Sequence, residues 1–237
     1  MCIVAAVQSN YIPWKGYFDL INMADHFVLY DDVQYTTYSW RNRNKIKTPK
    51  GAEWLTIPVL HRSVDQRIQD TEVRGTFWRK KHWKSIVQSY RRAKYFDAYR
   101  GLFEELYLGA DDLLLSDINR RFLTAVCGLL GIQTPLSWSR EYNLGEGRIE
   151  RVVDMCTQLG ATEFLSGPTA KPYINEPLFT AAGIRVVWMD YGGYPRYNQL
   201  YCPPFIHEVS VIDLIFNEGA EGARRHMLSF GSRGDKE

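Results

Sequence analysis

Apolar and polar residues alternate in blocks at the start of the chain, in a pattern typical of a strand–helix–strand unit. Residues 2–7 form a short run of mostly apolar residues, which predicts a buried strand. Apolar positions between residues 17 and 24 then fall on one face at helical spacing. A second apolar run, 26–30, predicts another strand. Such a unit implies two parallel strands joined by a right-handed crossover.

The middle of the chain has a different pattern. Residues 41–47 and 54–59 predict a β-hairpin, because the Pro/Gly turn signal of residues 48–51 separates them. Apolar residues at helical spacing then predict three helices, near 77–91, 95–107 and 112–130. The middle is therefore expected to be a hairpin followed by a helical insertion.

Strand and helix patterns alternate again in the last third. Strands are predicted at 163–165 and 185–189, and helices at 149–156, 175–182 and 210–217. The chain is thus predicted to be an α/β protein with an open, mostly parallel, Rossmann-like sheet, a β-hairpin and a helical insertion at about 75–131. With neither repeat nor linker visible, we predict one domain over 1–228 and a flexible polar tail at 229–237.

Composition narrows the picture further. The 237 residues include 29 basic and 27 acidic ones, and the formal net charge of +2 gives no general reason to expect nucleic acid or a membrane surface as partner. Four scattered cysteines and the lack of about 20 consecutive apolar residues predict a cytoplasmic protein without a membrane span. The 15 Tyr and 7 Trp suit a pocket for a polar organic ligand, although a Tyr-rich core has the same composition.

Polar residues gather where the predicted strands end. These ends are 8–10, 31–34, 166–167 and 190–191. In open parallel sheets, ligands bind beyond the C-terminal ends of the strands. We therefore expect Gln8, Asn10, Gln34, Ser166 and Asp190 to bind substrate.

Asp31 and Asp32 form the most suggestive acidic pair. A carboxylate at a strand end can act as a general base, hold a substrate ammonium or bind a divalent cation. Because neighbouring side chains on extended backbone point to opposite sides, only one of the two is expected to face the site. The alternative is that an aspartate caps a turn. We assign Asp31 as catalytic and Asp32 as substrate-binding.

Cations alternate along the first strand of the predicted hairpin. Arg41, Arg43 and Lys47 share one face at the period of two, and Asn42 and Asn44 share the other. Three cations on one face suit a phosphate or a carboxylate, although an exposed strand face has the same pattern. Arg41, Arg43, Asn44 and Lys47 are predicted to bind substrate.

One histidine and one loop complete the candidate site. His82 lies beside the apolar stripe of its helix, where it is either an acid or base, or a structural histidine. Lys171 and Tyr173 follow the loop after the third parallel strand and are predicted to contact substrate oxygens. His207-Glu208 begins like a zinc-binding H-E-x-x-H motif but lacks its second histidine, so no metal site is predicted.

Several of these segments resemble the WbqC-like protein family. The resemblance is carried by 8–19, 30–35, 40–44, His82-Trp83 with Tyr90, 93–96, 166–173 and 190–197. It runs from about residue 3 to residue 217, with Ser9 where the family pattern has proline. It implies a role in O-antigen or related surface-polysaccharide biosynthesis, with transfer of glycine onto an amino sugar as one suggested reaction.

On this basis the chain is predicted to be an acyl or aminoacyl transferase that forms an amide on a nucleotide-linked amino sugar. The only nucleic acid expected as a partner is an aminoacyl-tRNA, which would serve as the acyl donor. Two alternatives stay open: a non-catalytic module that binds a nucleotide sugar or carrier, and an ATP-dependent carboxylate–amine ligase that uses ATP with Mg²⁺. The second follows from a similarity between the opening unit and HIGH-type nucleotidyltransferases, although residues 13–17 lack their two phosphate-contacting histidines.

Overall fold

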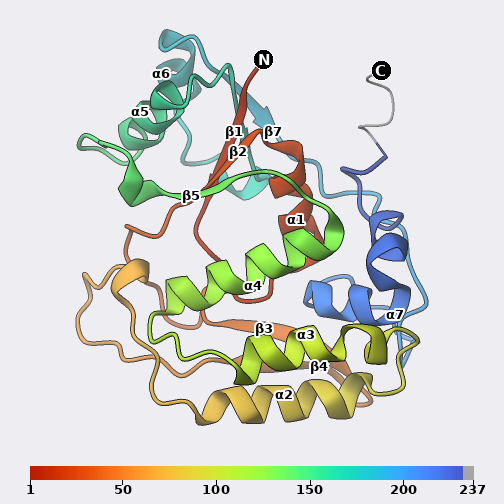
Figure 1. Ribbon diagram of the computed structural model, residues 1–237. Helices are drawn as coiled ribbons and strands as arrows, with labels where there is room; N and C mark the ends of the chain where they lie inside the picture. Colours follow the sequence, from red (N-terminus) through yellow and green to blue (C-terminus); the bar gives the residue numbers. More distant parts are fainter. Residues whose placement is uncertain (232–237) are drawn as a thin grey trace.

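The structure is a computed structural model, and it describes residues 1–231. Its centre is a sheet of five parallel strands in the order β5-β2-β1-β6-β7 (Figure 1). The strands are β1 (Ile3–Val7), β2 (His26–Leu29), β5 (Leu136–Trp138), β6 (Glu163–Ser166) and β7 (Arg185–Trp188). Strands β2 and β5 lie on one side of β1, and the later strands β6 and β7 lie on its other side. This arrangement confirms the predicted open, Rossmann-like α/β sheet.

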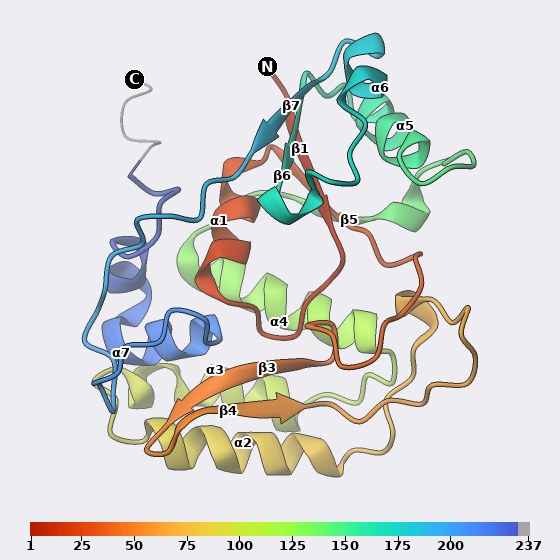
Figure 2. The same cartoon turned by 180° about the vertical axis from the view of Figure 1, so that it is seen from behind.

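Helices cover both faces of the sheet because its strands are apolar on both sides. Phe27 and Leu29 of β2 pack into one core with helices α1 (Lys15–Met23) and α4 (Leu115–Leu130). Val28, between them, points to the opposite core, which α5 (Glu150–Gln158) and α6 (Glu176–Ala181) complete. Figure 2 shows these two helix pairs on either side of the strands.

The long segment between β2 and β5 contains the predicted hairpin and three helices. Strand β3 (Arg43–Thr48) pairs antiparallel with β4 (Gly51–Thr56). The helices are α2 (Phe77–Tyr90), α3 (Phe96–Leu108) and α4. The hairpin turn is tighter than predicted, because Thr48 pairs with Gly51 and only two residues connect the strands. Gly51 has a φ of 108°, a conformation that glycine adopts without strain.

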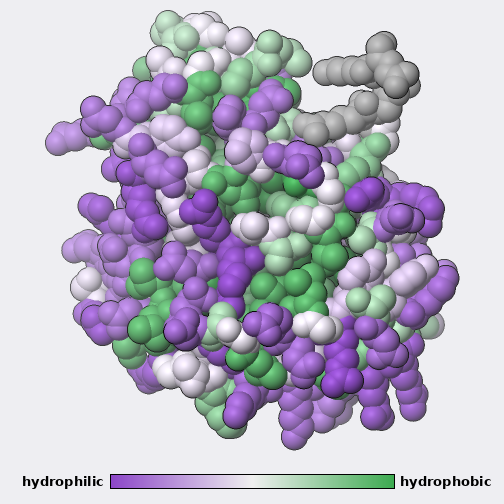
Figure 3. Space-filling view, viewed as in Figure 1, coloured by the Kyte–Doolittle hydropathy of each residue, from purple (hydrophilic) through white to green (hydrophobic). Residues whose placement is uncertain are grey.

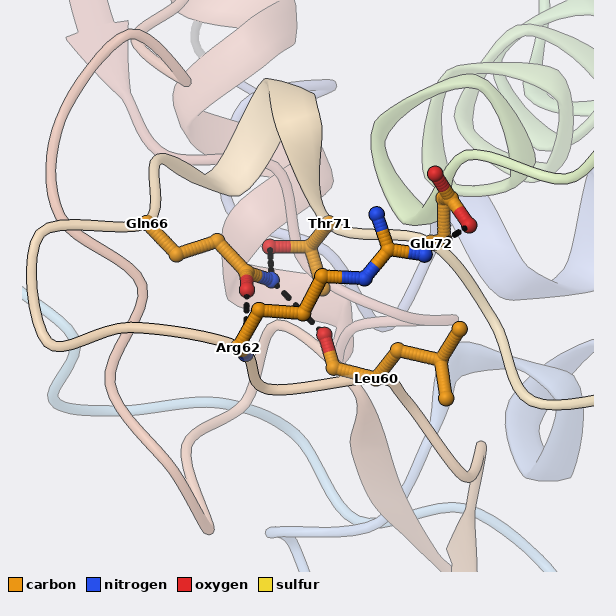
Figure 4. Close-up of polar contacts among 5 residues, drawn as sticks. All are labelled: Leu60, Arg62, Gln66, Thr71 and Glu72. Carbon is orange, nitrogen blue, oxygen red and sulfur yellow. Dashed lines mark hydrogen bonds and ion pairs between the residues drawn. The ribbon is translucent and has the colours of Figure 1, made fainter.

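A long connection joins β4 to α2 and contains the 3₁₀ turn η1 (Ile68–Asp70). Gln66 holds this connection together: its Oε1 accepts from the Arg62 N–H at 2.8 Å, and its Nε2 donates to Leu60 O and Thr71 Oγ1, both at 2.9 Å. Figure 4 shows Gln66 between the two limbs of the connection. The side chain thus satisfies backbone groups that have no sheet partner.

The C-terminal helix α7 (Val211–Arg224) packs beside α4 and α3, with a break in helical geometry at Gly219. Two further 3₁₀ turns, η2 (Ser139–Glu141) and η3 (Pro168–Ala170), follow β5 and β6. Ser229, placed in the predicted tail, is buried and donates to Asp19 Oδ1 at 2.5 Å. The rest of the predicted tail, 232–237, lies outside the described residues.

The face seen in Figure 1 is hydrophilic over most of its rim, with an apolar area near its centre beside α4 (Figure 3). Within residues 1–231, none of the helices has both the length and the apolar character needed to cross a membrane.

Candidate functional site

A pocket of about 750 Å³ opens at the C-terminal ends of β1, β6 and β7. It lies where β1 separates β2 from β6, the point at which the strand order reverses and where open α/β sheets bind ligands. The hairpin region and the segment before α7 contribute its other sides, through Trp40 and Asn44 and through His207 and Glu208. Figure 2 shows where the hairpin and α7 lie relative to the sheet. The lining residues are Asn10, Pro13, Trp14, Trp40, Asn44, Thr169, Tyr191, Gly193, Tyr194, His207 and Glu208.

Aromatic rings form one wall of the pocket. The Trp14 ring centre lies 5.2 Å from that of Tyr191 and 5.4 Å from that of Tyr194. The indole rests on the start of α1, where a Cβ on Gly16 would lie only 2.3 Å from the ring. The absence of a side chain at Gly16 therefore lets Trp14 pack flat and take part in the wall.

Arg41 sets the orientation of two predicted site residues. Its guanidinium donates to Gln8 Oε1 at 2.7 Å and to Asn10 Oδ1. Because a guanidinium only donates, it fixes the Asn10 oxygen toward itself and turns the Asn10 NH₂ group away from it. Asn10 lines the pocket, and its NH₂ group takes no part in the bond to Arg41.

Asn44 fixes the loop after β1. Its Nδ2 donates to Tyr11 O at 3.1 Å and to Ile12 O at 2.9 Å, while its Oδ1 accepts from Lys45 N–H at 2.8 Å. Ile12 has a φ of 36°, which is unfavourable for a β-branched residue. The hydrogen bonds from Asn44 help to hold this conformation and so shape the pocket.

His207 and Glu208 contribute an imidazole and a carboxyl group to the pocket. Burial lowers the pKa of His207, and the nearby charges of Lys15 and Arg196 lower it further, against the opposing effect of Glu208. Its Nδ1 is inaccessible to solvent and has no hydrogen-bond partner among residues 1–231. His207 is therefore a neutral imidazole at neutral pH, able to accept a proton.

Lys15 lies behind the aromatic wall. Its Nζ donates to Pro195 O at 3.2 Å and lies 4.7 Å from the ring centre of Tyr194. Burial lowers its pKa to about 8, although the carboxylates of Asp19 and Asp213 oppose the shift.

Asp31 and Asp32 point to opposite sides, as extended backbone requires. Asp31 is buried, accepts from Ser9 N–H at 2.7 Å and from the Ser116 hydroxyl, and its pKa is raised by burial. Asp32 accepts from Ser139 Oγ at 2.6 Å and pairs with Arg151. Neither side chain lines the pocket.

His82 is buried on α2, outside the pocket. Its Nδ1 lies 3.0 Å from the Tyr11 hydroxyl and its Nε2 3.1 Å from Thr56 O. Burial lowers its pKa to about 4, so the ring is neutral, with Nε2–H donating to the carbonyl and Nδ1 accepting from Tyr11. Tyr107 completes this buried chain, 2.6 Å from the Tyr11 hydroxyl.

Arg41, Arg43 and Lys47 do not form a single cationic face of the hairpin. Strand β3 begins at Arg43, so Arg41 precedes it and turns toward Gln8 and Asn10. Lys47 is buried and donates to Pro204 O. The Arg43 guanidinium lies 4.2 Å from the ring centre of Trp54, on the outside of the hairpin.

The remaining predicted residues lie around or away from the pocket rather than in its lining. Ser166 ends β6 and is buried. Gln34 donates to Val64 O at 2.8 Å and does not line the pocket. Lys171 lies over Trp188, Tyr173 lies under Arg148, and Asp190 accepts from Gly192 N–H at 2.8 Å.

The aromatic wall and His207 were not predicted as site residues. Trp14, Tyr191 and Tyr194 belong to the segments that carry the family resemblance, and this resemblance is the signal that could have found them. His207-Glu208 was considered only as part of a zinc motif. Over the described part of the chain, no group of three or more His, Cys, Asp or Glu side chains is arranged to hold a metal ion.

Comparison with known proteins identifies the family. The sequence model of the WbqC-like protein family matches residues 8–225, nearly the whole chain. The chain belongs to the WbqC-like protein family. This WbqC-like protein is 47% identical over 219 residues to the uncharacterized protein Rv1507c of Mycobacterium tuberculosis (strain ATCC 25618 / H37Rv), which covers 92% of this chain and 94% of the relative. No solved structure matches it significantly.

Proposed function

We propose that this WbqC-like protein is an acyl or aminoacyl transferase that forms an amide on a nucleotide-linked amino sugar, in O-antigen or related surface-polysaccharide biosynthesis. The observation that supports this most directly is the pocket at the strand-order reversal, which combines an aromatic wall with His207 and Glu208. Glycine, carried as an activated ester or thioester, is the acyl group suggested by the family resemblance.

The pocket suits a sugar ring. Aromatic faces pack against the apolar C–H faces of a sugar, while a few polar groups fix its orientation. Trp14, Tyr191 and Tyr194 supply the rings here, and the Asn10 NH₂ group supplies a fixed donor. Arg41 and Gln8 keep Asn10 in place, so they act by positioning rather than by touching substrate.

His207 is the base of the proposed reaction. The sugar amine attacks the acyl carbonyl carbon, a C–N bond forms, and the bond from that carbon to the leaving oxygen or sulfur breaks. His207 takes the proton from the amine nitrogen and returns it to the leaving atom. The Asn10 NH₂ group donates to the carbonyl oxygen as its negative charge grows.

Asp31 and His82 have supporting roles in this proposal. Asp31 accepts from the Ser9 N–H, next to Asn10, and His82 holds Tyr11 on the other side. Both would therefore affect turnover by placing the loop after β1. Asp32, Gln34, Arg43, Lys47, Ser166, Lys171, Tyr173 and Asp190 remain proposed substrate contacts, although none of them lines the pocket.

The test is an amide-formation assay followed by mass spectrometry. Nucleotide-linked amino sugars are combined with acyl-CoA, with aminoacyl-tRNA, or with glycine, ATP and Mg²⁺. We expect one donor class to give the amide, and His207→Ala to reduce its formation by at least about 100-fold, the scale of a general base. A product that forms only with ATP and Mg²⁺ would identify a ligase instead.

His226→Ala is the matched control. His226 is also partly buried, its pKa is also lowered by burial, and it lies outside the pocket lining. We expect it to keep wild-type turnover. Binding of the amino sugar without product from any donor would contradict the transferase and favour the non-catalytic binding module.

A further inference from the structure

The outer side of the hairpin carries exposed aromatic rings between cations. Tyr38 is 77% exposed, Trp40 43% and Trp54 42%, although large aromatic side chains are usually more buried. Trp40 and Trp54 are in contact, with ring centres 5.2 Å apart. We call Tyr38, Trp40, Arg43, Lys45 and Trp54 the hairpin platform.

Two cations are held against these rings. The Arg43 guanidinium lies 4.2 Å from the ring centre of Trp54 and 5.4 Å from that of Tyr38. Lys45 Nζ lies 5.0 Å from the centre of Trp54 and 5.9 Å from that of Trp40. Strand pairing explains the arrangement, because Lys45 lies directly opposite Trp54 in the β3–β4 ladder.

The platform is continuous with the pocket. Trp40 lines the pocket and also contacts Trp54, so a ligand can extend from the pocket onto the outer side of the hairpin. Neighbouring Asn44 points the other way and lines the pocket. One strand, β3, therefore supplies both a pocket residue and the platform cations.

We propose that the hairpin platform binds the nucleoside diphosphate of a nucleotide-linked sugar whose sugar ring occupies the pocket. This inference rests on the proposed function and names a second part of the same substrate site. The base stacks on the indole rings, and the diphosphate contacts Arg43 and Lys45.

The chemistry of the platform fits both parts of that ligand. Every nucleobase has an apolar π face, and stacking on Trp is tolerant of base identity. A guanidinium stacked on an indole keeps its N–H edge available, and this edge matches the geometry of phosphate oxygens. Within residues 1–231, Arg43 forms no ion pair with an acidic side chain. Its Nε is inaccessible to solvent, so a phosphate would contact the terminal NH₂ groups of the guanidinium.

The test measures binding of two ligands, a nucleoside and its diphosphate, by isothermal titration calorimetry. Uridine and uridine diphosphate serve as probes, with the adenosine pair as a second set. Trp54→Ala is expected to weaken binding of both members of a pair by roughly 5- to 100-fold, as loss of base stacking does. The double change Arg43→Ala and Lys45→Ala is expected to weaken only the diphosphate and to remove most of its salt dependence.

Two controls use side chains outside the platform. Phe77→Ala removes an aromatic side chain that is 78% exposed on α2, and Lys50→Ala removes a cation from the hairpin turn. Both should bind the diphosphate as the wild type does. Melting temperatures show whether each variant is folded, and Arg43→Lys should restore charge without restoring the stacked geometry.

Three results would overturn the inference. The first is unchanged diphosphate affinity in Trp54→Ala and in the double variant. The second is amide formation with unaltered KM for the sugar nucleotide in both variants, which would leave the proposed function standing. The third is tight, Trp54-dependent binding of a short RNA with no binding of nucleoside diphosphates. Conversely, platform-dependent binding without any amide product would reject the proposed function alone.

Discussion

At the scale of single residues, the shape of the pocket depends on the absence of a side chain at Gly16. The Trp14 indole occupies the space where a Cβ would lie, 2.3 Å from a ring carbon. In Gly16→Ala the ring has to move, at a cost of about 1–3 kcal/mol in packing. We expect the thermal stabilisation by a nucleotide-linked amino sugar to fall, as measured by differential scanning fluorimetry at several ligand concentrations.

Gly101→Ala provides the comparison. Gly101 lies inside α3, and a Cβ there would have open space within 4 Å. Alanine is favoured over glycine within a helix by about 1 kcal/mol. The variant should melt at a higher temperature and keep the full ligand-induced shift. Equal ligand responses in Gly16→Ala and Gly101→Ala would contradict the assigned role of Trp14.

The pH dependence of turnover is also set by individual residues. The pKa of His207 is lowered below its ordinary value of 6.5 by burial, Lys15 and Arg196. The proposed base is active when neutral, so activity should stay constant as the pH falls to 6.5 and decline only at lower pH. Rates of amide formation between pH 4.5 and 8 measure this decline in activity. A decline centred above pH 7 would exclude His207 as the base.

At the scale of elements, the connection between β4 and α2 depends on one glutamine. Gln66 makes three hydrogen bonds across it, whereas Arg62 makes an exposed ion pair with Glu72 at 2.9 Å (Figure 4). Gln66→Ala leaves backbone groups without partners and should lower the free energy of unfolding by about 1–3 kcal/mol. Arg62→Ala should cost less than about 1 kcal/mol. Chemical denaturation of both variants measures these two losses in the free energy of unfolding. Equal losses would mean that water takes over the hydrogen bonds of Gln66.

The elements differ in how well the sequence predicts them. Strands β1 and β2 follow from short apolar runs, and helices α1, α2 and α4 follow from apolar residues at helical spacing. Strand β5, only Leu136–Trp138, was missed because three residues show no period. Arg41 was placed in a strand that begins two residues later, because alternation continues past the end of sheet pairing.

The candidate site was predictable only in part for a related reason. Asn10 was predicted because it follows the end of a predicted strand, and Asn44 because it lies on a strand of the predicted hairpin. Residues 190–209 contain His207 and have neither strand nor helix, so no pattern indicates what they approach. Asp31 is hydrogen-bonded to Ser116, and His82 to Tyr11, and both partners are distant in sequence. The sequence pattern does not predict such contacts or the burial of these two side chains, because both are set by tertiary packing.

At the scale of the whole molecule, buried titratable groups link stability to pH in opposite directions. Burial lowers the pKa of His82 to about 4 but raises the pKa of Asp31 and of Asp213. Below pH 6.5 the unfolded chain binds a proton at His82 that the folded chain does not, so acid destabilises the fold there. The two aspartates bind protons more readily when folded, so they oppose this effect.

The contribution of His82 can therefore be measured only as a difference. His82→Gln removes the titrating group, so the free energy of unfolding should fall less between pH 6.5 and pH 4 than in the wild type, by on the order of 3 kcal/mol. Urea denaturation at half-unit pH steps gives both slopes. Parallel curves for wild type and His82→Gln would mean that His82 takes up a proton in the folded protein. The assignment of a neutral His82 in the row of hydrogen bonds from Tyr107 through Tyr11 to Thr56 O would then be wrong.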